Sequence, residues 1–104
     1  MYIQEYIKTQ YSGFQTLCEM HHVSSIYAFG SSTSSSFDPD KSDIDLVVEI
    51  DERDPLKRGN DLLELWNKLE LFFRRKVDIL TSSSIKNPVL KESIDRSKVL
   101  IYER

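Results

Sequence analysis

The sequence lacks a second cysteine, a long apolar run and a recognisable leader. Because Cys18 is its one cysteine, no disulfide can form within the chain, which is compatible with a reducing compartment. No stretch approaches the ~18 consecutive apolar residues that a membrane span needs. The first five residues have neither the basic flank nor the apolar core of a signal peptide. These absences predict a soluble cytoplasmic protein without a membrane segment.

An excess of basic charge is also missing. The chain has 14 Lys and Arg against 17 Asp and Glu, a net charge of −3. Proteins that bind nucleic acid in bulk use a basic face to neutralise phosphates, so that class is disfavoured. A nucleotide site is not excluded, because a bound metal ion can supply the positive charge. The 104 residues show no repeat or linker, which predicts one domain over residues 1–104.

Helical and strand patterns alternate along the chain, which predicts an α/β (α+β) layered domain. A first helix is predicted from apolar residues at helical spacing, namely Ile3, Ile7, Phe14 and Leu17. Asp54 followed by proline predicts the start of a helix that runs to about Phe73, and Asn87 followed by proline precedes a short one. The predicted strands cover residues 25–29, 44–50, 76–80 and 98–102.

The apolar faces of these helices supply the predicted core. The residues expected to be buried are Leu56, Leu62, Leu63, Leu65, Trp66, Leu69 and Phe72 or Phe73 in the long helix, and Val89, Leu90 and Ile94 in the short one. Cys18 is expected to face the core. His21 and His22 could suggest a metal site, but adjacent residues on a helix diverge by about 100°, so the pair is interpreted as an exposed helix end. The basic run at residues 74–76 is interpreted as a solvated helix end.

Two aspartates stand at the start of the strongest predicted strand. Asp43 and Asp45 are two residues apart, so in a strand they share one face with their Cα atoms roughly 6–7 Å apart. Two anions this close repel each other unless a cation lies between them. Asp78, inside another apolar strand, completes a set of three if the two strands pair. Three carboxylates on one sheet face suit hard divalent ions, above all Mg²⁺.

A glycine-serine turn precedes these aspartates. Gly30-Ser31 follows the first predicted strand, and glycine lets the backbone approach an anionic ligand closely. Carboxylates for a metal beside backbone amides for a phosphate indicate a nucleotide-handling site. Each piece alone is common in ordinary turns and strand edges. Their conjunction in this order is far more specific.

That conjunction resembles the DNA polymerase β-type nucleotidyltransferase superfamily, and more closely the minimal nucleotidyltransferases of bacteria and archaea. Segments 27–31 (YAFGS), 42–48 (SDIDLVV) and 77–80 (VDIL) carry the match, which extends over nearly the whole chain. The resemblance implies a mixed sheet flanked by helices, with the active site on one sheet face. It also implies transfer of a nucleoside monophosphate from ATP, or another nucleoside triphosphate, to a hydroxyl with release of pyrophosphate.

The same resemblance implies roles for six residues. The residues that would bind the nucleotide are Gly30, Ser31 and Ser42. The residues that would hold two Mg²⁺ ions and form the catalytic set are Asp43, Asp45 and Asp78.

The resemblance also implies a partner. Minimal nucleotidyltransferases are often encoded beside a HEPN-domain protein, an α-helical RNase toxin, and some transfer AMP to a tyrosine of that toxin. The expected role is therefore that of an antitoxin. An antitoxin that acts by binding alone is the first alternative, because residues 32–36 contain no basic residue for a triphosphate and Lys41 is the nearest cation. Transfer to a small molecule such as an aminoglycoside is the second, although 104 residues leave little surface to enclose one.

Overall fold

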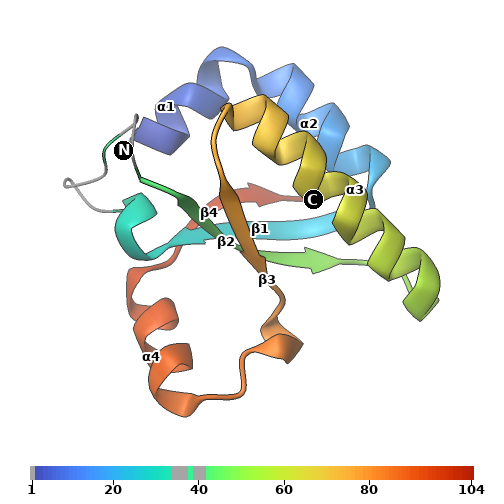
Figure 1. Cartoon of the computed structure of the whole chain (residues 1–104). Coiled ribbons are helices and arrows are strands. Elements are labelled where there is room, and N and C mark those ends of the chain that lie inside the picture. The colour runs from blue at the N-terminus through green and yellow to red at the C-terminus, as the bar shows by residue number, and fades with distance from the viewer. Residues whose placement is uncertain (1, 34–37, 39–41) are drawn as a thin grey trace.

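The computed structural model describes residues 2–33, 38 and 42–104 (Figure 1). Its elements are, in chain order, helix α1 (Tyr2–Thr9), helix α2 (Tyr11–Met20), strand β1 (Val23–Phe29), 3₁₀ turn η1 (Gly30–Thr33), strand β2 (Ile44–Ile50), helix α3 (Pro55–Phe73), strand β3 (Val77–Leu80), 3₁₀ turn η2 (Ser82–Ser84), helix α4 (Pro88–Ser97) and strand β4 (Val99–Glu103). Among these described elements, none of the helices combines the length and apolar content needed to cross a membrane.

The four strands form one mixed sheet in the order β3-β2-β1-β4. Strand β1 is antiparallel to both β2 and β4, whereas β2 and β3 are parallel and are joined through α3. A parallel pair needs a crossover connection of this kind, usually a helix. The predicted α/β fold with a mixed sheet flanked by helices is confirmed.

The two sheet faces differ in what covers them. Helices α1, α2 and α3 lie over one face, and α4 lies on the opposite side (Figure 1). Strand residues alternate between the faces. The core under the three helices contains Ile3, Phe14, Cys18, Ile26, Ala28, Ile44, Leu46, Val48, Leu65, Leu69, Phe73, Val77 and Ile79. Residues between these on β1, β2 and β3, including both strand aspartates, therefore face the side that α4 covers only in part.

The starts of α3 and α4 follow the predicted capping pattern. The side chain of Asp54 accepts a hydrogen bond from the backbone N–H of Leu56 at 2.9 Å, and Asn87 accepts one from Val89 at 2.9 Å. In both helices proline occupies the first turn, where its missing N–H costs nothing. These caps fix where α3 and α4 begin.

The prediction of one continuous N-terminal helix was wrong. The chain forms α1 and α2 with a break at Gln10, whose φ and ψ of −134° and 35° are not helical. The Thr9 hydroxyl donates to the carbonyl of Tyr6 at 2.7 Å. Such a bond from a side chain back to the preceding turn competes with the helical ladder and bends or ends helices.

Parts of the predicted core were also wrong. On α3, Leu56 and Leu63 are 84% and 63% exposed, because the face that meets the sheet is built from Leu65, Leu69 and Phe73 at four-residue spacing. On α4 the exposed residues are Val89 and Leu90, while Ile94 is buried. Trp66 is partly buried and donates its indole N–H to the carbonyl of Val77.

The histidine pair divides between core and surface. His21, predicted to be exposed, is only 2% exposed, and its Nδ1 lies 2.8 Å from the carbonyl oxygen of Leu17. His22 is exposed as predicted. Helix α2 ends at Met20, and His22 has a φ of 60°, so the two histidines belong to the turn that leads from α2 to β1 and not to the helix.

Candidate active site

The pairing of β2 with β3 brings two of the predicted site residues together. Asp45 and Asp78 are each the second residue of their strand and are direct partners across the parallel ladder. Paired residues point to the same face, so both carboxylates lie on the side away from the helical core. Asp43 lies immediately before β2 and is exposed. The condition under which three carboxylates converge, pairing of these two strands, is therefore met.

The electrostatics of Asp45 reflect this crowding. Burial raises the pKa of its carboxyl above the ordinary value of 3.8, and the negative charges of Asp78 and Asp43 raise it further. Desolvation and like charges both disfavour the ionised form of a carboxyl. A cation bound between these groups would reverse the repulsion and favour ionisation. The negative charges of Asp78 and Asp43 therefore act on Asp45 in the folded chain.

The turn after β1 packs its backbone against Asp45. Gly30 has a φ of +63°, a left-handed conformation that residues other than glycine rarely adopt. A Cβ atom at this position would lie 3.3 Å from Oδ2 of Asp45. The hydroxyl of Ser32, which is fully buried, accepts a hydrogen bond from the backbone N–H of Asp45 at 2.8 Å. The hydrogen bond and the close approach of Gly30 place η1 beside Asp45. No residue pattern in the sequence singled out Ser32.

Two of the predicted nucleotide ligands, Gly30 and Ser42, make hydrogen bonds within the chain. The N–H of Gly30 donates to the hydroxyl of Ser97 on α4 at 3.2 Å. Ser42 closes a turn with Asp38, since its N–H donates to the Asp38 carbonyl at 2.8 Å and its hydroxyl accepts from the Asp38 N–H at 3.0 Å. Ser31 belongs to η1, but its side chain, like all of Lys41, lies outside the described residues.

Comparison with known proteins agrees with this geometry. The family model for the nucleotidyltransferase domain matches residues 13–101, which include β1, η1, β2 and β3. The chain belongs to the nucleotidyltransferase domain family. Its matched region contains all six predicted site residues, and membership assigns it nucleotidyltransferase activity.

Individual nucleotidyltransferases extend this result. A relative from Methanocaldococcus jannaschii, named as a candidate protein adenylyltransferase, is 40% identical over 86 residues, covering 83% of this chain and 82% of the relative. A solved structure named as a candidate minimal nucleotidyltransferase superposes with a TM-score of 0.70 at 26% identity, covering 92% of this chain and 93% of the other. The resemblance to the minimal nucleotidyltransferases that the sequence motifs indicated is confirmed.

A third similarity is to a toxin-antitoxin assembly. A chain from the complex of tri-AMPylated Shewanella oneidensis HEPN toxin with an MNT antitoxin matches with a TM-score of 0.56, covering 89% of this chain and 69% of that one. At 22% identity this likeness shows a shared fold.

The end of α4 and the residue that follows it lie beside η1 and β1, and the sequence did not single out either residue. The Ser97 hydroxyl accepts a hydrogen bond from the Gly30 N–H, and the Nζ of Lys98 lies 4.9 Å from the centre of the Tyr27 ring. A small cavity of about 70 Å³ lies between α4 and the sheet, lined in part by Tyr27, Val47 and Lys98.

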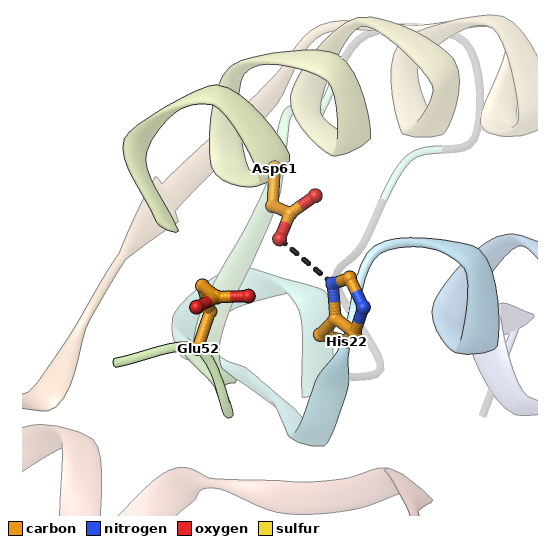
Figure 2. Close-up of side chains that lie close together, drawn as sticks. All are labelled: His22, Glu52 and Asp61. Carbon is orange, nitrogen blue, oxygen red and sulfur yellow. Dashed lines mark hydrogen bonds and ion pairs between the residues drawn. The ribbon is translucent and has the colours of Figure 1, made fainter. Parts of the chain in front are cut away.

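A second cluster of ionisable groups lies at the other end of β1. Figure 2 shows His22, Glu52 and Asp61, whose ligand atoms all lie within 4.8 Å of one another, with His22 Nδ1 2.9 Å from Asp61 Oδ2. The whole length of β1 separates His22 from Gly30 (Figure 1). The His22–Asp61 contact joins the turn between α2 and β1 to α3. This cluster was not predicted, and it is separate from the sheet-face aspartates.

Proposed function

We propose that this nucleotidyltransferase transfers AMP from ATP to a hydroxyl group of a partner protein. The observation that carries the proposal is the direct pairing of Asp45 with Asp78 beside the left-handed turn at Gly30. Carboxylates and a backbone turn on one sheet face suit a metal-bound triphosphate. The relatives named as candidate protein adenylyltransferases support AMP as the transferred group and a protein as the acceptor.

Asp43, Asp45 and Asp78 fit Mg²⁺. All three supply carboxylate oxygens, the donors that hard divalent ions prefer. The raised pKa of Asp45, caused by burial and by the other two aspartates, is relieved when a cation joins the set. Two Mg²⁺ ions held there would neutralise the phosphates and lower the pKa of the acceptor hydroxyl.

The transfer step joins the acceptor hydroxyl to the α-phosphate of ATP, and residues of the chain position both groups. The acceptor oxygen attacks the α-phosphorus of ATP, a new O–P bond forms, and the bond to the β-phosphate breaks to release pyrophosphate. Gly30, Ser31 and Ser42 bind the nucleotide at the turn. Asp78, on the neighbouring strand, receives the proton of the acceptor hydroxyl at its carboxylate.

A HEPN-domain toxin is the proposed partner, and one of its tyrosines is the proposed acceptor. The fold is shared with the antitoxin complex that contains an AMPylated HEPN toxin, and the chain belongs to the same group of small nucleotidyltransferases. Attachment of AMP to the toxin would make this chain its antitoxin.

The direct test incubates the chain with labelled ATP, Mg²⁺ and the protein encoded by the adjacent gene. Label should appear on the partner, and Asp43→Asn with Asp45→Asn should remove it while the fold stays intact. The matched control is Glu5→Gln with Glu19→Gln, which removes two exposed charges from α1 and α2 on the far side of the sheet and should leave transfer unchanged. Full transfer by the aspartate double variant would refute the assigned site.

Neutralisation by binding alone is a second candidate function. It is favoured by the hydrogen bond from the Gly30 N–H to Ser97, which occupies one donor expected for phosphate, and by the lack of a cation in η1. In that case the Asp43→Asn, Asp45→Asn variant would still co-purify with the toxin and still block its RNase activity. A neutralised toxin without attached AMP would favour binding over transfer.

A further inference from the structure

A triphosphate at this site needs more positive charge than the described part of the turn supplies. Residues Gly30 to Thr33 include no cation, and the neighbouring Asp43, Asp45 and Asp78 are all acidic. Metal ions bound by the aspartates would compensate their charge. The β- and γ-phosphates, which leave together as pyrophosphate, would be stabilised by a basic group that reaches this sheet face from another element.

Lys98 is held on the same sheet face as the carboxylates. It follows α4 directly, where its backbone N–H donates to the carbonyl of Ile94 at 2.8 Å. Its Nζ lies 4.9 Å from the centre of the Tyr27 ring and 3.1 Å from Oδ1 of Asp95. An ammonium over an aromatic face is attracted by the ring quadrupole, so the charge stays near the sheet.

The strand register places this ammonium close to the candidate site. Tyr27 is the direct partner of Val47, which lies two residues beyond Asp45 on the same face of β2. Two residues along a strand span roughly 6–7 Å. The residue before Lys98 is Ser97, whose hydroxyl accepts the N–H of Gly30. Lys98 is therefore next to the turn on one side and to the carboxylate strand on the other.

We infer that Lys98 binds the β- and γ-phosphates of the nucleotide donor. This inference rests on the proposed function and adds a phosphate ligand to it. The present partner of Lys98, Asp95, forms an ion pair in which the two side chains are 37% and 49% exposed. Exposed pairs of this kind are weak, so a phosphate with several charges displaces the carboxylate readily.

A neighbouring cation on α4 provides the matched control. Arg96 precedes Lys98 by two residues, which on a helix turns it about 200° away. It is 76% exposed and pairs with Glu92 on the outer side of the helix. Arg96→Met and Lys98→Met each remove one positive charge from the same helix end, and only the second removes it from the sheet face.

The experiment measures binding of ATP, AMP and inorganic pyrophosphate, each with Mg²⁺, by calorimetry without any acceptor. Lys98→Met should weaken ATP and pyrophosphate about tenfold or more, the loss expected for one charge-assisted contact, and should change AMP by less than about twofold. Lys98→Arg should retain most of the affinity, and Arg96→Met should bind all three as the unmodified chain does. Thermal unfolding of each variant verifies that α4 remains in place.

Three results would overturn the inference and leave the proposed function standing. Unchanged ATP binding in Lys98→Met shows that the side chain does not contact phosphate. An equal loss in Lys98→Met and Arg96→Met shows an effect of overall charge, and an equal loss for AMP and ATP shows a structural role. An unmodified chain that binds neither ATP nor pyrophosphate refutes the proposed function as well.

Discussion

Gly30 brings the backbone into close contact with the candidate active site. Its φ of +63° is left-handed, and a Cβ atom at this position would lie 3.3 Å from Asp45 Oδ2, so no side chain fits there without strain. Gly30→Ala should lower the free energy of unfolding by about 1–2 kcal/mol, the cost of a left-handed alanine. It should also reduce AMP transfer strongly, because the Asp45 carboxylate must move.

The chain contains its own controls for this substitution. Gly13 and Gly59 lie inside α2 and α3, and nothing lies within 4 Å of a Cβ atom at either position. Alanine at these positions should raise the free energy of unfolding by about 0.5–1 kcal/mol, because glycine is a poor helix residue. Chemical denaturation of the three variants measures the contrast. Destabilisation of the same size at all three positions would contradict the role given to Gly30.

At the residue scale, the sequence predicted the residues whose positions follow from their spacing along a strand. It missed the residues that are brought together only when distant elements pack against each other. Asp45 and Asp78 lie in recognisable strand patterns, so their shared face was predictable, whereas Asp43 lies just before β2 and not in the strand as expected. Ser97 lies beside Gly30 because the end of α4 returns to η1, 67 residues further along the chain. Separation of that size leaves no periodic signal.

Among the elements, α4 is the one whose stability matters most for the proposed phosphate site. Of its ten described residues only Ile94 is buried, so little apolar packing holds it. The Asn87 side chain caps its start through the N–H groups of Val89 and Leu90. Asn87→Ala should cost about 1 kcal/mol, mostly in α4. Faster amide exchange along α4 and weaker ATP binding should follow together.

Removal of the cap of α3 distinguishes an effect specific to α4 from an effect of general stability on ATP binding. Asp54→Ala removes the cap bond to Leu56 and should also cost about 1 kcal/mol. Because α3 packs on the core face, its loosening should leave ATP affinity unchanged. Hydrogen exchange and calorimetry on both variants test this. Equal loss of ATP affinity in the two variants would indicate that general stability, and not α4, governs binding.

Element boundaries were predictable where local chemistry marks them. The segment from Pro55 to Phe73 has a capping aspartate and a first-turn proline, and the strand Ile44–Ile50 is rich in β-branched residues. The break at Gln10 depends on a side-chain bond from Thr9 that competes with a helical pattern. The exposure of Leu56 and Leu63 depends on which face of α3 meets the sheet, and that is settled by tertiary packing.

At the scale of the whole molecule, the two faces of the sheet differ: one packs against the helical core, and the other carries the candidate active-site aspartates. Three helices bury one face, and the aspartates occupy the other, where α4 gives partial cover (Figure 1). The histidine-carboxylate contact at His22 and Asp61 fastens the far end of the same sheet to α3 (Figure 2). Acidic groups gathered on an active face are costly in the metal-free protein, so global stability should report on the site.

The pH dependence of unfolding tests this directly. The pKa of Asp45 is raised in the folded chain by burial and by Asp78 and Asp43, so the unfolded chain releases its proton first as pH rises. Stability is therefore lost as pH rises above 3.8 through the folded pKa, and it stays lower at neutral pH. Asp45→Asn should unfold at higher denaturant than the unmodified chain at pH 7, with no difference below about pH 3.8.

A carboxylate with the opposite shift provides the control. The hydrogen bond and charge of Arg104 lower the pKa of Asp51, so its contribution is present above 3.8 and is lost as pH falls through the folded pKa. Asp51→Asn should therefore be less stable than the unmodified chain at pH 7, the reverse of Asp45→Asn. Added Mg²⁺ should stabilise the unmodified chain and the Asp51 variant but not Asp45→Asn, because binding to the folded state alone shifts the equilibrium. Lower stability of Asp45→Asn at pH 7 would contradict the crowding of the three aspartates.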